Sequence, residues 1–416
     1  MGVGVRMAKM KNYQELAIGL PRQCASLRDE AHRFAEEVIR PAARNLDRPD
    51  IQPPVVNPDS SLLQIIKAAY GLGYHRAVLP AHFGGLGLPS LGIHILLEEL
   101  GWGSAGIALS LLSSSLPVLA LIADGRSKMI ERFVKPFVEN RDASWIGCWA
   151  LSEPRHGSDH FLVGSDEFRY PTNGVDLIAR ADSRKYVLEG RKAAWITNGG
   201  IATHALCSVT IEPSKAAQVF MVVPLDLPGV SRSPAPAKLG QREMNQAQIV
   251  FNKVEVPREY LLKGEGFEQE VARLLTLAHS GMAAIITGAA RAAYEAALDH
   301  STRRRQGGKR ICDHQLVRQA LFEMFTGVEA CRAFSRAALV YNWETVKPSL
   351  ETAIAAKIFC TRTALQVVDR AMQVFGADGT AVGNPVEKLY RDIRVSIVEQ
   401  GSNEVLMLAG ANAILS

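Results

Sequence analysis

Apolar residues recur at helical spacing in two parts of the chain. Residues 60–70 place leucine, isoleucine and alanine side chains on one face of a predicted helix. The same offsets return in residues 274–285, 317–328 and 354–368, which predicts three long helices toward the C-terminus. Long helices joined by short connections are typical of an antiparallel bundle.

The middle of the chain has a different pattern. Short β-favouring runs there are separated by turn residues, and in residues 249–256 apolar and polar positions alternate. We therefore predict an antiparallel β domain over residues 146–258. A helical N-terminal domain (residues 1–145) precedes it, and a C-terminal four-helix bundle (residues 259–416) follows it.

Composition narrows the class of protein without naming a function. The 416 residues are 47% hydrophobic and 21% charged, which is ordinary for a globular chain of two or three structural units. The net charge of +5 contains no long basic run, so no nucleic-acid partner is expected. Six scattered cysteines form no CxxC pair, so we expect reduced thiols and no metal site. Serines and Pro117 interrupt the most apolar stretch, so no membrane span is expected.

Two segments of the middle domain could contact a flat, polar ligand. Residues 149–159 (WALSEPRHGSD) end a predicted strand in a loop of small hydroxyl side chains and glycine. In residues 190–200, Trp195 and Thr197 are two positions apart, which places both on one face of a strand. A plain turn and a tryptophan that fills the core remain the structural alternatives.

Two segments of the C-terminal third could bind a ligand, one through arginine side chains and the other through backbone N–H groups. Residues 303–309 (RRRQGGK) combine arginine with a glycine bend, a pattern that suits pyrophosphate. Residues 373–379 (QVFGADG) form a glycine-rich turn between predicted helices. Solvated charge at a helix end is the alternative for the first segment. For Arg391 and Asp392 we prefer a structural ion pair.

Taken in order, these segments resemble the acyl-CoA dehydrogenase family over nearly the whole chain. The matching segments are residues 33–34, 79–80, 83–87, 151–159, 195–199, 373–379, 391–392 and 401–405. The resemblance implies an N-terminal helical domain, a middle β-barrel-like domain and a C-terminal four-helix bundle. It also implies FAD bound between the middle and C-terminal domains, with help from a neighbouring subunit.

The resemblance assigns roles to individual residues by motif match. Those along the flavin would be Trp149, Leu151, Ser152, Gly157, Ser158, Trp195, Thr197, Ser402 and Glu404. Those that hold the pyrophosphate and adenosine side of a partner's FAD would be Arg304, Gln315, Gln373, Gly376 and Ala377. Ser158, Gln400 and Gly401 would contact substrate. The implied reaction removes an α-proton to a carboxylate and a β-hydride to the flavin, giving a 2-enoyl-CoA.

The sequence departs from the family at the catalytic base. Gln400 stands where most members have glutamate, and a neutral amide cannot serve as a general base. Some members carry the glutamate on the first long helix of the C-terminal bundle, but no acid lies in residues 280–284 around Met282. Glu399 is the candidate substitute, and Glu404 is a weaker one because its family match faces the FAD.

Three hypotheses follow. The chain is an FAD-dependent acyl-CoA dehydrogenase with a relocated base, a base-less FAD- and acyl-CoA-binding subunit of a mixed oligomer, or a flavoenzyme of the same fold with elimination or oxygen chemistry. By resemblance the substrate is an acyl-CoA or acyl-carrier thioester, and the electron acceptor is an electron-transfer flavoprotein. We expect a cytoplasmic homotetramer.

Overall fold

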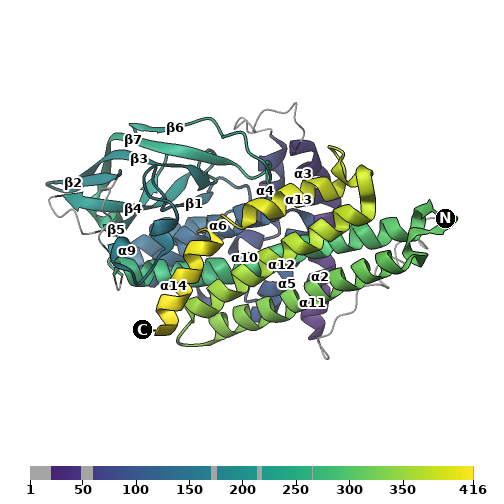
Figure 1. Cartoon of the computed structure of the whole chain (residues 1–416). Helices are drawn as coiled ribbons and strands as arrows, with labels where there is room; N and C mark the ends of the chain where they lie inside the picture. The colour runs from purple at the N-terminus through teal and green to yellow at the C-terminus, as the bar shows by residue number, and fades with distance from the viewer. Residues whose placement is uncertain (1–19, 48–59, 170–175, 213–217, 265, 416) are drawn as a thin grey trace.

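The computed structural model describes residues 20–47, 60–169, 176–212, 218–264 and 266–415. Figure 1 shows a curled sheet beside a stack of long helices, with the C-terminal helix α14 next to the sheet. The predicted order of a helical domain, a β domain and a second helical domain is confirmed.

The N-terminal domain is helical, as its apolar spacing predicts. Its helices are α2 (Arg22–Phe34), α3 (Arg40–Leu46), α4 (Ser61–Gly71), α5 (Ser90–Gly103), α6 (Ala105–Asp124), α7 (Ser127–Met129) and α8 (Lys135–Glu139). Serine caps begin two of them: the Ser60 hydroxyl accepts the N–H of Leu63 at 3.4 Å, and the Ser104 hydroxyl accepts the N–H of Ile107 at 3.2 Å. Helices α5 and α6 are buried along most of their length, so they form the core on which the other domains pack.

Within the described residues, the middle domain is a seven-stranded sheet with strand order β1-β4-β2-β3-β7-β6 and with β5 paired to β4. The strands are β1 (Gly147–Ala150), β2 (Ile178–Asp182), β3 (Lys185–Thr197), β4 (His204–Glu212), β5 (Gln218–Pro224), β6 (Val230–Arg232) and β7 (Gln246–Pro257). The prediction of a wholly antiparallel sheet needs one correction. Strand β4 runs parallel to both β1 and β2, because the chain crosses over before it returns to the sheet.

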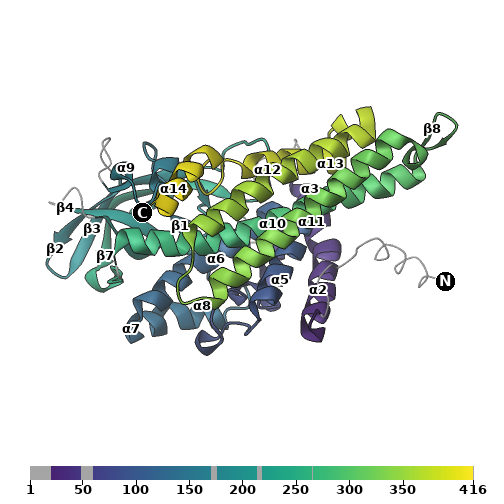
Figure 2. The same cartoon turned by 60° about the horizontal axis from the view of Figure 1, so that its bottom comes forward.

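Helices again make up the C-terminal domain. They are α10 (Phe267–Arg303), α11 (Gln315–Glu344), α12 (Leu350–Phe375), α13 (Pro385–Ser396) and α14 (Asn403–Leu415). The hairpin of β8 (Arg305–Gln306) and β9 (Lys309–Arg310) joins α10 to α11 at the end of the bundle far from the sheet, as Figure 2 shows. Gly307 and Gly308 both have positive φ, as a two-residue hairpin turn requires.

Helix α5 crosses α10 with almost no space between the two backbones. A Cβ atom on Gly288 would lie 1.9 Å from the carbonyl oxygen of Glu98, and one on Gly101 would lie 2.1 Å from that of Ile285. Only glycine fits at such distances. This contact fixes the N-terminal domain against the C-terminal bundle.

A buried charge cluster, made of Glu98, Glu99, Arg291 and Arg332, lies at the same crossing. Arg291 Nη1 donates to Glu98 Oε1 at 2.9 Å and to Glu99 Oε1 at 2.8 Å, and Arg332 Nη2 donates to Glu98 Oε1 at 3.0 Å. All four side chains are at most 3% exposed. The cluster therefore links α5, α10 and α11 through ionic contacts shielded from water.

Among the residues that the structure describes, two helices, α6 and α10, are long and apolar enough to cross a membrane by length and composition alone. The interruptions that argued against a span in the sequence do not break α6, which continues through Pro117. Of the most apolar stretches of these helices, 94% and 83% respectively are buried inside the protein. Packing within the fold accounts for their apolar composition.

Candidate active site

The end of β1 is held by several donors that converge on one carbonyl. The Leu151 oxygen accepts hydrogen bonds from His160 Nδ1 at 3.1 Å, from Ser208 Oγ at 3.2 Å and from Lys192 Nζ at 3.4 Å. Lys192 is fully buried and pairs with Glu153 at 2.7 Å. Because these donors hold the Leu151 carbonyl in place, they also fix the orientation of residues 149–158 at the end of β1.

The predicted ligand-contacting residues of this segment lie around that strand end. Trp149 is on β1, and its indole Nε1 is buried with no hydrogen-bond partner among the described residues. The Ser152 carbonyl accepts the N–H of Ala193 at 2.9 Å, which ties the segment to β3. A Cβ atom added to Gly157 would meet no described atom within 4 Å, so the backbone there faces open space.

Trp195 and Thr197 lie near the end of β3 and share one face, as their spacing predicts, while Ile196 between them is buried. Trp195 is 58% exposed, which is unusual for so large an apolar side chain. Asn198 fixes the strand end, because its Nδ2 donates to the Ser110 carbonyl at 2.9 Å and to the Gly147 carbonyl at 3.0 Å. The two predicted flavin-facing residues therefore project from a rigid support.

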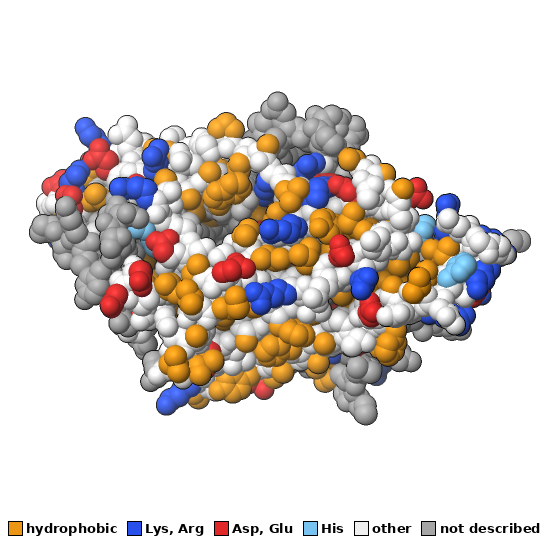
Figure 3. All heavy atoms as spheres, in the orientation of Figure 1, with side chains coloured by type: hydrophobic (Ala, Val, Ile, Leu, Met, Phe, Trp, Pro, Cys, Tyr) orange, Lys and Arg blue, Asp and Glu red, His pale blue; other side chains and the backbone are white. Residues whose placement is uncertain are grey.

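Residues 397–402, here called the α13–α14 turn, bring Gln400 and Gly401 to the loop after β1. Gln400 has φ of 52° and Gly401 has φ of 94°, so the chain reverses through two left-handed residues. The Ser402 N–H donates to the Ser158 hydroxyl at 3.1 Å. The structure thus places together the three residues assigned to substrate: Ser158, Gln400 and Gly401. Figure 3 shows the surface hollowed between the sheet and the C-terminal helices.

Glu399 is partly buried in the same turn rather than solvated. Its Oε2 accepts the side-chain N–H of Gln241 at 2.9 Å. Burial raises the pKa of Glu399 to about 7, with Asp392 acting in the same direction and the Gln241 hydrogen bond and two lysines against it. One of these lysines is Lys238, whose Nζ donates to Gln246 Oε1 at 2.8 Å. Gln246 Nε2 in turn donates to the Trp195 carbonyl at 3.2 Å, so a lysine whose charge acts on Glu399 is linked by hydrogen bonds to the backbone of Trp195.

Gln400 itself makes no side-chain hydrogen bond through its oxygen, since Oε1 is buried and lacks a partner in the described structure. Its backbone carbonyl accepts from His279 Nε2 at 2.9 Å. Sequence reasoning missed His279, which lies near the α10 position considered for a second glutamate; Met282, at that position, is fully buried. Burial lowers the pKa of His279 to about 3, so its imidazole is neutral. Glu404 is exposed in the first turn of α14.

A pocket of about 140 Å³ lies between β5 and the start of α10. Its wall includes Phe220, Phe267 and Leu262, with Lys263 and Glu270 as charged members. The Phe220 ring is 4.9 Å from that of Phe267 and 6.5 Å from that of Trp149. This aromatic row, which no sequence motif signalled, leads from the pocket to the end of β1.

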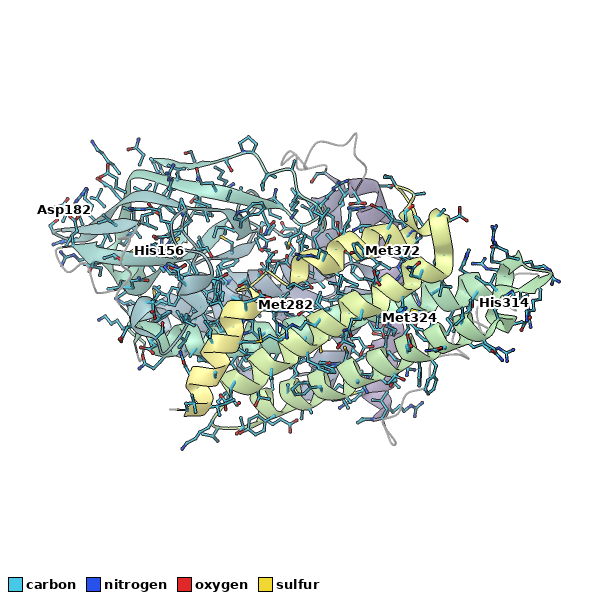
Figure 4. The ribbon with its side chains drawn as sticks, in the orientation of Figure 1. His156, Asp182, Met282, His314, Met324 and Met372 are labelled. Carbon is cyan, nitrogen blue, oxygen red and sulfur yellow. The ribbon has the colours of Figure 1, made fainter. Side chains whose placement is uncertain are left out.

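The second group of predicted cofactor residues lies elsewhere. Arg304 follows α10, Gln315 begins α11, and residues 373–377 span the end of α12 and the start of the 3₁₀ turn Gly376–Thr380. His300 stacks on Phe375 at 4.1 Å, which joins the ends of α10 and α12. In Figure 4 the labelled His314 beside this group and His156 beside β1 lie toward opposite ends of the molecule. One chain therefore does not bring the two groups of residues together.

Arg391 and Asp392 are both ion-paired, but not to each other as we predicted. Adjacent residues on α13 project in different directions. Arg391 Nη2 pairs with Asp47 Oδ2 at 2.5 Å, and Asp392 Oδ2 pairs with Lys388 Nζ at 2.5 Å. Asp392 also accepts the Gln241 N–H at 2.5 Å. This pairing anchors the loop that carries Gln241 and Lys238.

Among the described residues, two groups of side chains have the spacing of metal ligands. Asp47, Glu243 and Asp392 form one, and the ammonium of Lys388 already binds two of its carboxylates. The other contains His156, Asp159 and His160. The two imidazole rings are stacked in parallel at 5.2 Å, so their lone pairs, which lie in the ring planes, do not converge on one point. Neither arrangement favours a bound metal ion.

Comparison with known families gives three matches in chain order. Residues 22–141 match the N-terminal domain, residues 148–254 the middle domain, and residues 264–415 the C-terminal domain of acyl-CoA dehydrogenases.

Individual relatives agree with this. The chain is 28% identical over 406 residues to the human mitochondrial short-chain specific acyl-CoA dehydrogenase, covering 96% of this chain and 92% of that one. It is 29% identical to cyclohexane-1-carbonyl-CoA dehydrogenase of Geobacter metallireducens, covering 93% of this chain and 98% of that one. The solved butyryl-CoA dehydrogenase of Megasphaera elsdenii superposes with a TM-score of 0.84 at 27% identity, covering 96% of this chain and all of that one.

Proposed function

Because the chain belongs to the acyl-CoA dehydrogenase family, we propose that it is an FAD-dependent oxidoreductase that removes two hydrogens from an acyl thioester, with Glu399 as the proton acceptor. The observation that carries this proposal is the position of Glu399. It lies next to Gln400 in the α13–α14 turn, where Gln241 donates a hydrogen bond to it and the charge of Lys238 acts on it. Lys238 is in turn linked through Gln246 to the backbone carbonyl of Trp195.

Family members are flavoproteins, and several features of this chain fit a bound flavin. Trp195 presents a large exposed ring at the end of β3, and the buried indole N–H of Trp149 lacks an acceptor among the residues described. Open space at Gly157 leaves room for a ligand against the backbone. Trp149, Ser152, Ser158, Trp195 and Thr197 would hold the ring system, which accepts the hydride when bound.

The protein's own residues would handle the proton. A general base works best when its pKa lies near the working pH, and the pKa of about 7 for Glu399 meets that condition. Backbone N–H groups of the α13–α14 turn would polarise the thioester carbonyl, which acidifies the α-proton. The Gln400 amide cannot accept that proton, so in this proposal it only lines the site.

One observation favours a second candidate function. The side chain at the family's base position is neutral, which suits a subunit that binds FAD and acyl thioester but does not oxidise the thioester itself. In that case Glu399 serves only to hold Gln241.

The choice of substrate, acceptor and location extends the same proposal. The names of the relatives include short-chain, butyryl-CoA and cyclic acyl-CoA substrates, which supports an acyl-CoA or acyl-carrier thioester. The aromatic row that ends at Phe267 is a candidate path for the carrier arm. We also propose an electron-transfer flavoprotein as acceptor and a cytoplasmic location.

Anaerobic titration of the purified, FAD-loaded protein with a panel of acyl-CoA thioesters tests the function. We expect at least one saturated thioester to bleach the flavin absorbance in a single turnover. A flavin that binds thioesters, seen as a spectral shift, but stays oxidised would support the base-less subunit instead.

Arg304→Ala is expected to weaken FAD binding, because a charge-assisted contact to phosphate would be lost. Since Arg304 lies far from Trp195 within one chain, this contact would be made to a neighbouring subunit's FAD. The measurement is the FAD dissociation constant by fluorescence, and Arg303→Ala, next to it and paired with Asp299, is the matched control.

The same arrangement implies a homo-oligomer, which we propose to be a tetramer. Light scattering on the FAD-loaded protein checks this. A monomer with full FAD occupancy, or equal FAD binding by Arg304→Ala and Arg303→Ala, would contradict the shared site.

A further inference from the structure

Lys357 is a fully buried amine that contacts the α13–α14 turn. It projects from α12, and its Nζ donates to the Gly401 carbonyl at 3.0 Å and to Asn403 Oδ1 at 2.8 Å. Both acceptors are neutral, and within the described part of the chain no carboxylate forms an ion pair with it. An ammonium buried on neutral acceptors is costly, so its position calls for a compensating role.

The two hydrogen bonds of Lys357 hold the turn next to its two residues with left-handed backbone conformation. Gln400 and Gly401 are both left-handed, a conformation that a residue other than glycine adopts only when its surroundings enforce it. His279 binds the Gln400 carbonyl, and Lys357 binds the next one. Together they fix two successive peptide groups, those that follow Gln400 and Gly401, in the turn that carries Glu399.

Charge couples Lys357 to Glu399 as well. The titratable groups that act on Lys357 are Glu399 in the turn, Glu404 on α14 and the neutral His279 on α10. Burial lowers the pKa of Lys357 to about 7, and the two glutamates oppose this.

Glu399 has its own set of neighbours. From the loop before β7 it is faced by Lys238 and Gln241, from α13 by Asp392, and from α12 by Lys357. The two lysines stabilise its carboxylate form, and Asp392 disfavours it. Lys238 is held on the Met244 carbonyl at 2.7 Å and on Gln246, whereas Lys357 is held on the turn itself.

We propose that Lys357 is a positioning residue for Glu399: its Nζ fixes the backbone of the α13–α14 turn, and its protonated form favours the carboxylate form of Glu399, which is the form that accepts the substrate proton. This inference rests on the proposed function, since it gives Glu399 the role of proton acceptor. Lys357 does not touch the substrate in this scheme and acts only through the turn and its charge.

Three substitutions separate the two parts of this role. Lys357→Met removes the donor and the charge but keeps the aliphatic stem; Lys357→Gln keeps a donor without the charge; Lys357→Arg keeps both. Arg362→Met, on the exposed face of α12, is the matched control for loss of a positive charge from the same helix. The readout is the infrared carboxyl band of Glu399, assigned with Glu399→Gln and titrated with pH in the FAD-loaded protein without substrate.

We expect the midpoint of this titration to rise by ~1 pH unit in Lys357→Met and Lys357→Gln, because a nearby opposite charge is lost. It should stay within ~0.3 unit of wild type in Lys357→Arg and Arg362→Met, where the local charge is kept or the lost charge is solvated. An unchanged midpoint in the methionine and glutamine variants overturns the proposal, even if thermal stability falls. Should only one of those two variants fold, its midpoint decides alone.

The pH profile of flavin reduction separates the role of Lys357 from the role of Glu399 as the base. If Lys357→Gln moves the profile to higher pH together with the infrared midpoint, both the role of Lys357 and that of Glu399 are supported. If the infrared midpoint moves but the rate profile does not, Lys357 controls the charge of Glu399 while Glu399 is not the base. That outcome overturns the catalytic role but not the coupling.

Discussion

Glu399→Gln is expected to slow flavin reduction by a saturated acyl thioester by ~10²–10⁴-fold, the usual contribution of a general base. Glutamine fills the same space and can still hydrogen-bond to Gln241, but it cannot accept a proton. The measurement is the single-turnover rate of flavin bleaching under anaerobic conditions. Thioester binding, followed by the shift of the oxidised flavin spectrum, should change little.

Gln400→Glu is the companion variant, because it restores a carboxylate at the family's base position. Where Glu399 is the base, wild type is already fast and Gln400→Glu adds little. A slow wild type that gains rate with Gln400→Glu and is unaffected by Glu399→Gln would support the base-less subunit. Fast bleaching that survives Glu399→Gln would contradict both and direct attention to another group.

The pH dependence of the wild-type rate gives an independent check. Burial raises the pKa of Glu399 to about 7, and the ionised form is the one that accepts a proton. The rate should therefore climb about tenfold per pH unit below the pKa and level off above it. The stability of the fold depends on pH in the opposite direction. Because the pKa of Glu399 is raised in the folded protein, its contribution to the free energy of unfolding is complete below its ordinary pKa of 4.5 and is lost as the pH rises through about 7.

Glu98→Gln is expected to destabilise the folded protein by ~3–5 kcal/mol, because it leaves arginines of the buried charge cluster without a full counter-charge. Burial opposes ionisation of Glu98, but the charges of Arg332 and Arg291 outweigh it and hold its pKa below the ordinary value. Glutamine preserves the volume, so the loss reports charge rather than packing. Denaturant unfolding of the two proteins measures the difference in free energy of unfolding.

An exposed pair provides the control. Glu131 and Lys135 lie 3.5 Å apart with more than half of each side chain in solvent, so Glu131→Gln should cost less than about 1 kcal/mol. Since the folded-state pKa of Glu98 is depressed, its contribution is present above about pH 4.5 and disappears only as the pH falls further. Equal losses for the two variants would mean that the cluster adds no net stability.

Local pattern was enough to predict most of the fold. In the long helices α10, α11 and α12 apolar residues recur at helical spacing, and in β7 apolar and polar residues alternate, so these helices and this strand were predicted. Strand β4 was not, because it is buried on both faces and reads as a plain apolar run. Its parallel pairing with β1 depends on a crossover that no short segment encodes. The π-helical segment Ala35–Ile39 within the first helices gave no sequence signal either.

The candidate site was predictable only where a motif marks it. Trp195, Ser158 and Gln400 were found by residue type and order, and the structure brings the α13–α14 turn, which carries Gln400, to Ser158. Lys357, His279 and Gln241 were missed, because each acts on the α13–α14 turn from a segment more than 40 positions away. The role of Glu399 likewise depends on burial and charge that only the assembled fold creates.

The left-handed backbone at Gln400 separates the shape of the turn from the chemistry it can perform. Its conformation is imposed from outside by His279 and Lys357, and glutamine and glutamate have side chains of the same length and branching. The position can therefore exchange an amide for an acid without refolding, whereas a β-branched residue there would be strained. A single substitution at position 400 can therefore add or remove a proton acceptor without changing the backbone of the turn.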